Sequence, residues 1–257
     1  MFWRKKKTEE TEAKIILGMV LLNEALHFSI DDFFKDYRAH YDDEIGEVTG
    51  NDTIATFNID REMIAISLMP VPVPWGDIEG TAKYAYNWET ATDDLKDHKA
   101  HLIISSLKGG NDPVYRFGIF TQVICSLLRT TNAIGVYKGN QSLLIDKNAY
   151  LNLAALMSED QYPLNLWVYF GFVRHGEKNS GYTYGLVEFG KKEMEILNSD
   201  KSLGDVMGFL FNMSHYVLQF GVEFKEGQTC GLSAEEKIRI SYSKGKLVEG
   251  YSFKLAY

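Results

Sequence analysis

The first hundred residues alternate short apolar runs with segments whose apolar residues recur at helical spacing. A helix is expected after Ser29, because its side chain can cap the helix together with Asp32 three residues on. A weaker helical pattern covers 78–88. The apolar runs have the length of strands and cover 15–22, 53–59, 63–69 and 100–107. The order strand, helix, strand, strand, helix, strand predicts a ferredoxin-like (split βαβ) arrangement, with helices on one face of an antiparallel sheet.

The central part of the chain continues this mixture of helices and strands. Apolar residues lie nearly all round the helical pattern of 115–131, which predicts a buried helix rather than a surface helix. The run 133–137 is strand-like. Asp146 is placed to cap a further helix, with Tyr150 on its inner face.

The last hundred residues begin with a near-continuous aromatic and aliphatic run at 164–173, which is typical of a buried strand. This strand is expected to pair with 182–189 across a polar turn at 176–181. The two segments therefore predict a hairpin.

A helix and a final hairpin are expected to follow. Ser202 and Asp205 form a second capping-box variant, and Gly221 stands where the C-cap of that helix is expected. The segments 238–242 and 251–257 alternate apolar and polar residues on either side of a short turn. They predict an antiparallel hairpin with one face exposed to water.

Together these elements predict an α+β protein with antiparallel or mixed sheets and helices on one face. The ferredoxin-like arrangement belongs to its N-terminal part. We expect a flexible tail at 1–14, an N-terminal lobe at 15–160 and a C-terminal lobe at 161–257, closely packed on the first.

The charge of the chain narrows its partners. The formal net charge is −8, with 27 Lys and Arg against 35 Asp and Glu. Without the four basic residues at 4–7 the rest has 23 bases against 35 acids, or −12. Because nucleic acid is bound mainly through a basic face, an acidic chain is not expected to bind it. A partner with a basic surface is more compatible with this charge.

The cysteines and the N-terminus bear on the location of the protein. Cys125 lies inside an apolar run and Cys230 is the only other cysteine, so a disulfide framework is not expected and a reducing cytoplasm fits best. Acidic residues separate the basic residues at 4–7 from the first apolar run, so a signal peptide and a transmembrane segment are not expected. Phe2 and Trp3 beside those bases could contact an anionic membrane surface, and the alternative is a solvated tail.

Several strings of the second half resemble a known family. These are Y-T-Y-G-L-V-E-F-G-K-K-E-M-E-I-L at 182–197 and V-E-F-K-E-G-Q-T-C-G-L-S at 222–233. They resemble the bacterial family called domain of unknown function 4261. Segments at 69–80, 101–107 and 133–137 resemble the region that precedes this domain in longer members. The family has no established activity, so the resemblance implies no catalytic residues.

A second resemblance concerns catalysis. The string Arg174-His175-Gly176-Glu177 is similar to the R-H-G-E signature of the histidine phosphatase and phosphoglycerate mutase family. That resemblance implies a phosphorylated His175, a phosphate-binding Arg174 and His215 as a second histidine. In that family the motif follows the first strand of a doubly wound domain, whereas here only hairpins and one helix are expected after it. The alternative is a polar hairpin turn, which we favour.

Other titratable residues have structural interpretations beside the chemical ones. His98 and His101 have the spacing of metal ligands, but a solvated acidic loop is favoured and no metal site is expected. Glu188, Glu193 and Glu195 could take part in acid-base chemistry. We instead expect Glu193 and Glu195 in the first turn of a short helix, where acids complement the helix dipole.

The prolines of 70–74 predict a stiff surface rim, because they withhold backbone donors from a sheet. Trp75 and Asp77 follow at once and are candidate binding residues, while Trp75 could equally pack into the core.

The sequence therefore favours a non-catalytic binding or protein-interaction module. A phosphohydrolase that uses His175 is the alternative class. No phosphate-binding glycine motif occurs, so no bound cofactor is expected. Whether the partner is a protein or a small ligand, and the oligomeric state, stay open at this point.

Overall fold

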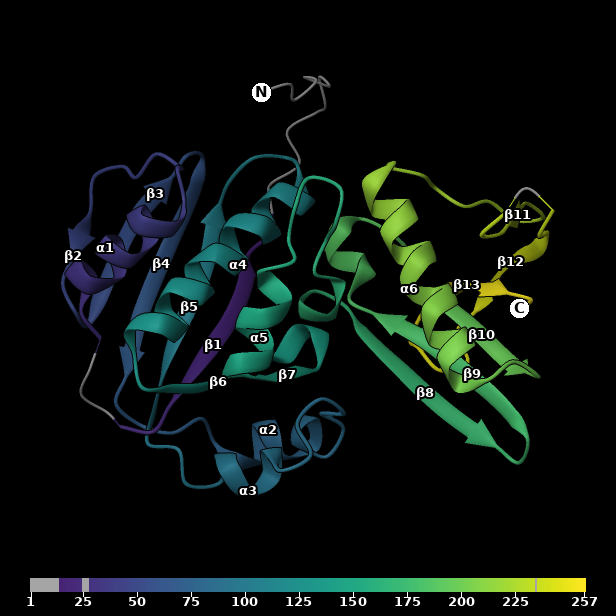
Figure 1. Ribbon diagram of the computed structural model, residues 1–257, viewed down its shortest axis with the longest axis horizontal. Helices are drawn as coiled ribbons and strands as arrows, with labels where there is room; N and C mark the ends of the chain where they lie inside the picture. The colour runs from purple at the N-terminus through teal and green to yellow at the C-terminus, as the bar shows by residue number, and fades with distance from the viewer. Residues whose placement is uncertain (1–13, 25–27, 234) are drawn as a thin grey trace. The chain divides into compact units, whose positions relative to one another are not determined.

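The computed structural model describes residues 14–24, 28–233 and 235–257. The chain folds as two compact units that divide between Tyr137 and Lys138. The boundary predicted from the sequence, after residue 160, comes later in the chain than this division. Both units combine helices with mostly antiparallel sheets, which confirms the α+β class. Figure 1 shows the elements of each unit. The candidate membrane contacts Phe2 and Trp3 lie outside the described residues.

The sheet of the first unit is antiparallel, with neighbours in the order β2-β3-β4-β5-β1-β6. Its strands are β1 (Ile16–Leu22), β2 (Thr49–Gly50), β3 (Ile54–Ile59), β4 (Glu62–Met69), β5 (Ala100–Lys108) and β6 (Ala133–Lys138). The apolar runs of the sequence therefore predicted the strands. The order does not confirm the ferredoxin-like detail, because β1 lies between β5 and β6.

Helices α1 (Ile30–His40) and α4 (Pro113–Thr130) lie on one face of this sheet (Figure 1). The Ser29 side chain accepts a hydrogen bond from the Asp32 amide at 3.2 Å, which confirms the predicted start of α1. Helix α4 is buried nearly all round, also as predicted, and Asp112 caps it. Within the described residues no helix is long and apolar enough to cross a lipid bilayer.

The single helix expected at 78–88 was wrong. Two short helices occur instead, α2 (Trp75–Ala82) and α3 (Ala91–Leu95). The segment between them is joined to α3 by side chains: the Trp88 indole donates to the Asp94 carboxylate at 2.7 Å, and the Thr90 hydroxyl donates to the same oxygen at 2.6 Å.

A buried ion pair joins strand, helix and loop in the first unit. Arg116 on α4 donates from Nε to Oε2 of Glu62 on β4 at 2.9 Å, and both side chains are at most 5% exposed. The Ser106 hydroxyl donates to the same oxygen at 3.2 Å. The Gly110 amide donates to Glu62 Oε1 at 2.8 Å. A buried charge is tolerated when it is paired and hydrogen-bonded in this way, so the loop after β5 must approach the carboxylate closely.

We predict that Gly109→Ala destabilises the first unit. A Cβ at Gly109 would lie 1.8 Å from Glu62 Oε2, and the carboxylate cannot move away without weakening the buried pair. Overpacking of this kind costs about 1–3 kcal/mol of unfolding free energy, measurable by urea denaturation. Gly110→Ala is the matched control, because its Cβ would have no contact closer than 3.7 Å. Equal effects of the two substitutions would contradict the argument.

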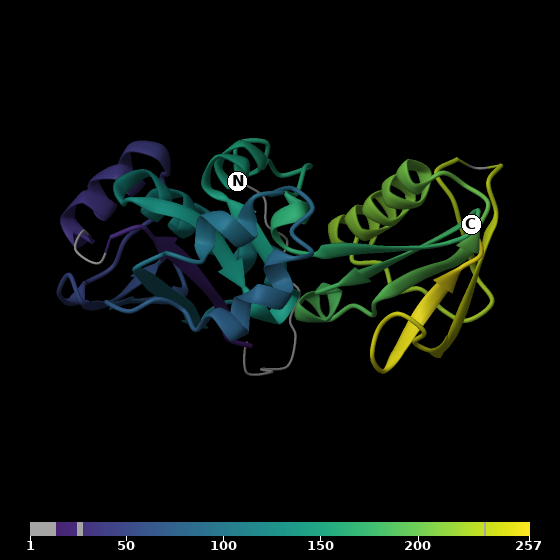
Figure 2. The same ribbon diagram turned by 90° about the horizontal axis from the view of Figure 1, so that it is seen from below.

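The second unit contains a six-stranded sheet in the order β11-β12-β13-β10-β9-β8. Among the described strands of this sheet, only β10 and β13 pair in parallel. Helix α6 (Leu203–Gln219) lies across one face of this sheet, as Figure 2 shows. The strands are β8 (Tyr169–His175), β9 (Lys178–Tyr184), β10 (Met194–Ser199), β11 (Thr229–Cys230), β12 (Ile238–Lys244) and β13 (Tyr251–Leu255). Strand β7 (Leu143–Asp146) and helix α5 (Lys147–Ala154) precede them.

The predicted helix caps of the second unit are confirmed, but two of its strands begin or end at other residues than predicted. Asp146 caps α5, and Ser202 with Asp205 forms the capping box of α6. The apolar run at 164–173 begins with the 3₁₀ turn η2 (Leu164–Leu166), so β8 starts only at Tyr169. Strand β9 ends at Tyr184, because Gly185 has φ +122° and leads into the 3₁₀ turn η3 (Leu186–Phe189).

Candidate functional site

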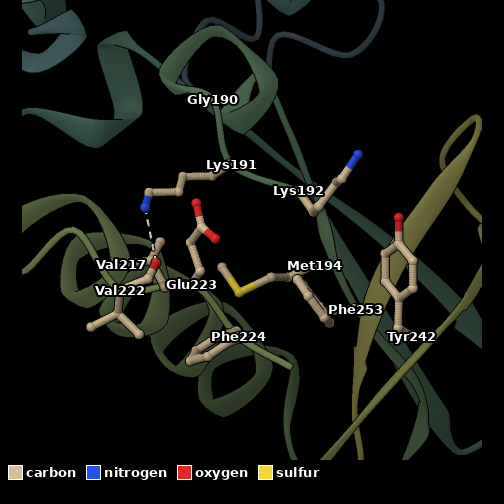
Figure 3. A pocket seen from close by; sticks show the side chains of 10 residues that line it. All are labelled: Gly190, Lys191, Lys192, Met194, Val217, Val222, Glu223, Phe224, Tyr242 and Phe253. Atoms are coloured by element: carbon tan, nitrogen blue, oxygen red, sulfur yellow. Dashed lines mark hydrogen bonds between the residues drawn. The ribbon is translucent and has the colours of Figure 1, made fainter. Parts of the chain in front are cut away.

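A pocket of about 220 Å³ lies in the second unit, on the face of the sheet that carries α6 (Figure 3). Its walls come from the end of α6, the segment that follows that helix, the start of β10, and strands β12 and β13. Most of the lining is apolar. The apolar and aromatic lining residues are Met194, Val217, Val222, Phe224, Tyr242 and Phe253.

Polar groups stand at the margin of this pocket. Lys191 donates from Nζ to the carbonyl of Val222 at 3.0 Å, which ties the segment before β10 to the segment after α6. Lys192 is exposed, and in Figure 3 its side chain extends away from Val222, on the side of Tyr242. Glu223 is also exposed and supplies the carboxylate of the lining.

Aromatic rings continue from the pocket along the hairpin of β12 and β13. Phe224 meets Phe253 edge to face with ring centroids 5.9 Å apart, and Phe253 lies 5.0 Å from Tyr242. Tyr242 in turn lies 5.6 Å from Tyr251, which is 60% exposed. This aromatic ladder (Phe224, Phe253, Tyr242, Tyr251) follows from strand register, because Tyr242 is directly opposite Phe253.

Glu193 fixes the segment that forms one wall. It was expected in a helix, but it lies directly before β10 and is 6% exposed. Its Oε1 accepts hydrogen bonds from the Gly185 amide at 2.8 Å and the Val187 amide at 3.3 Å. Its Oε2 accepts the Thr183 hydroxyl at 2.7 Å. Burial raises the pKa of Glu193 above 4.5 in spite of these donors.

Glu195 was also expected in a helix, and it instead lies within β10 with no exposed surface. Burial opposes its ionisation, but its donors outweigh burial and lower its pKa below 4.5. Lys254 pairs with it at 2.7 Å, and the Ser252 hydroxyl donates to it. The amides of Lys246 and Leu247 also donate, so Glu195 holds the connection between β12 and β13. The helix prediction failed because the donors come from segments distant in the sequence.

The residues of the phosphatase-like string have separate partners. Arg174 and His175 are exposed at the end of β8, where the Arg174 guanidinium donates to the Gly176 carbonyl at 3.2 Å. His215 lies on α6, where its ring stacks on Tyr162 at 5.1 Å and its Nε2 accepts the Tyr162 amide at 3.3 Å. The string thus forms the hairpin between β8 and β9.

The histidine pair of the first unit holds the proline-rich segment. His98 and His101 are 4% and 6% exposed, so the solvated loop expected for them was wrong. The Val73 amide donates to His98 Nε2 at 2.8 Å, and His101 Nδ1 lies 2.9 Å from the Val71 carbonyl oxygen. In the described part of the chain no cluster of three or more His, Cys, Asp or Glu side chains could hold a metal ion.

The two candidate binding residues lie at the start of α2. Trp75 is half-buried and Asp77 is exposed, and the Asp77 carbonyl accepts the Tyr137 hydroxyl at 2.9 Å. Their role in binding stays a prediction. The pocket is not predicted by any of the patterns described above for the sequence. The alternating aromatic residues of 242–253 were its signal, but they were interpreted as the faces of a hairpin.

We predict that Glu193→Gln changes the pH dependence of stability. Because the folded protein binds the proton of Glu193 more tightly than the unfolded chain, stability falls as pH rises from 4.5 through the raised pKa. Glu193→Gln should remove this decrease, which for one group is at most about 1.4 kcal/mol per pH unit. Urea unfolding between about pH 4 and 8 measures it. Glu177→Gln, at an exposed turn, should leave the profile unchanged, and a profile unaffected by Glu193→Gln would contradict the assignment.

Comparison with known proteins gives one match. Residues 182–256 match the model of the family described as domain of unknown function (DUF4261). No curated protein and no solved structure matches the chain. The matched region contains every residue that lines the pocket. The C-terminal part of the chain therefore resembles this domain of unknown function, as its strings predicted, and the pocket belongs to the region of resemblance.

Proposed function

We propose that this protein is a non-catalytic binding module and that its pocket receives one apolar or aromatic side chain of a partner protein. The observation that carries this proposal is an apolar pocket beside an exposed aromatic ladder. Aromatic residues of this kind are frequent at the centres of protein interfaces, where they surround an anchoring side chain of the partner.

The size of the pocket favours an anchoring side chain. Sites for drug-sized ligands have volumes of about 300–1,000 Å³, whereas this pocket has about 220 Å³. A cavity of about 150 Å³ is enough for benzene. The pocket thus suits one large side chain, and the rest of the partner would lie outside it.

The chemistry of the lining supports binding over catalysis. The polar side chains that line the pocket are two lysines and a glutamate beside the phenol of Tyr242. Among the described residues the lining contains no His, Ser, Thr or Cys. Nucleophilic catalysis requires a nucleophile within hydrogen-bond distance of a base. The alternative phosphohydrolase would use Arg174 and His175, and no observation on those exposed residues favours it.

A cytoplasmic location belongs to the same proposal. Cys125 is 2% exposed, and burial raises the pKa of its thiol to about 11. This thiol acts as a small apolar residue, which supports a protein that does not depend on disulfides.

We expect capped amino acids to bind the pocket. N-acetyl amides of Phe, Trp and Leu, titrated into protein with ¹³C-labelled methionine methyl groups, should shift the Met194 signal. Burial of one such side chain is worth about 1.5–3 kcal/mol, so dissociation constants should be about millimolar or weaker.

Two substitutions to tryptophan separate the pocket from the rest of the surface. Val222→Trp should fill the pocket and abolish the shifts. Leu203→Trp is the matched control, because Leu203 is exposed at the opposite end of α6. Absence of any shift in the unchanged protein, or equal binding by the two variants, would refute the proposed function.

A further inference from the structure

The end of the aromatic ladder has unpaired positive charge. Lys244 is directly opposite Tyr251 in the register of β12 and β13, so the two side chains share one face. Lys192 precedes Met194 by two residues, and Met194 pairs with Phe253 in parallel register. Tyr251 also precedes Phe253 by two residues. Lys192, which comes just before β10, and Lys244, which ends β12, therefore lie toward the same end of the sheet as Tyr251.

These two ammonium groups have no acidic partner in the described part of the chain. Other exposed lysines form ion pairs: Lys83 pairs with Glu79 at 2.9 Å, and Lys178 pairs with Asp200. Glu226 follows Phe224 by two residues in the segment after α6. Its carboxylate accepts a hydrogen bond from the Tyr242 amide and so fixes this segment against β12. Glu223 is the one acidic residue of the pocket lining.

The charges close to Tyr251, rather than the net charge of the chain, determine which charged groups bind beside it. The chain has a net charge of −8, but at physiological ionic strength charges are screened beyond about 8 Å. A group beside Tyr251 therefore interacts with the charges at this end of the sheet. Lys192 and Lys244 carry positive charge there, and the exposed Glu249 in the turn before Tyr251 carries one negative charge. The net charge favours a basic partner at long range, whereas the end of the ladder favours an anion.

We infer that the pocket binds an extended acidic segment of a partner protein, with an apolar side chain in the pocket and an Asp or Glu beside Lys192 and Lys244. This inference rests on the proposed function and adds the chemistry of the partner. The distance between the pocket and Tyr251 determines how many residues separate the acid from the anchoring side chain in the partner. Phe253, at the pocket, and Tyr251 are two positions apart along β13, which corresponds to about 7 Å. An extended partner covers the same distance in two residues, so the acid stands two positions from the anchor.

Capped peptides test the charge and the spacing. The probe is acetyl-Ser-Asp-Ser-Phe-Ser-Asp-Ser-amide, with acids two positions from Phe on both sides because the direction of binding is open. One control replaces both Asp by Asn, and a second places both Asp directly beside Phe. Neighbouring residues of an extended chain point to opposite sides, so the second control should lose the advantage.

We expect the first peptide to bind about two- to fivefold more tightly than the Asn peptide, as for an exposed ion pair. The advantage should disappear near 1 M salt, where screening acts within about 3 Å. Titration monitored by the Met194 methyl signal measures both. Lys192→Glu and Lys244→Glu should each remove the advantage. Lys244 does not line the pocket, so binding of the Asn peptide should stay unchanged in Lys244→Glu.

Lys237→Glu is the matched control for net charge. Lys237 is exposed and precedes β12, whereas Lys244 ends it, so the two are separated by roughly 20 Å. This variant should keep the preference for the acidic peptide. If Lys237→Glu removes it equally, or if acidic and Asn peptides bind equally to the unchanged protein, the inference is refuted and the proposed function stands. If no peptide shifts Met194, both fail.

Discussion

Carboxylates that leave water must find hydrogen-bond donors, and this protein buries Glu62, Glu193 and Glu195. In each case at least one donor is a backbone amide of a loop or turn. Glu62 binds the Gly110 amide and Arg116, while Glu195 binds the connection between β12 and β13. The demand for donors at these positions thus determines where the loops lie, and the geometry of both units depends on it.

The pocket is a consequence of the same demand. Glu193 holds the amides of Gly185 and Val187, which determines the path of the chain into the segment of Lys191 and Lys192. Lys191 then binds the carbonyl of Val222 on the opposite wall. The space between these walls is left apolar because it lies over the aromatic residues of β13 and the end of α6.

The sequence predicted the helices and strands far better than it predicted which segments pair with one another. Caps such as Ser29 and the Ser202–Asp205 box are local, since their donors and acceptors lie within three residues. Strand order is not local, and the order β5-β1-β6 of the first unit could not be derived from the succession of elements. Glu193 and Glu195 were placed in a helix for the same reason, because the groups that satisfy them lie up to 59 residues away.

The sequence by itself determined the α+β class, the caps, most strand and helix positions and the resemblance of 182–256 to a domain of unknown function. The tertiary structure alone decided that two histidines hold a proline-rich segment, that three glutamates are buried, and that Tyr242, Tyr251 and Phe253 lead out of a pocket. The physical reason is the separation in sequence over which each kind of interaction acts. Periodicity and capping act between neighbours in the chain, whereas burial and charge pairing depend on which distant segments meet.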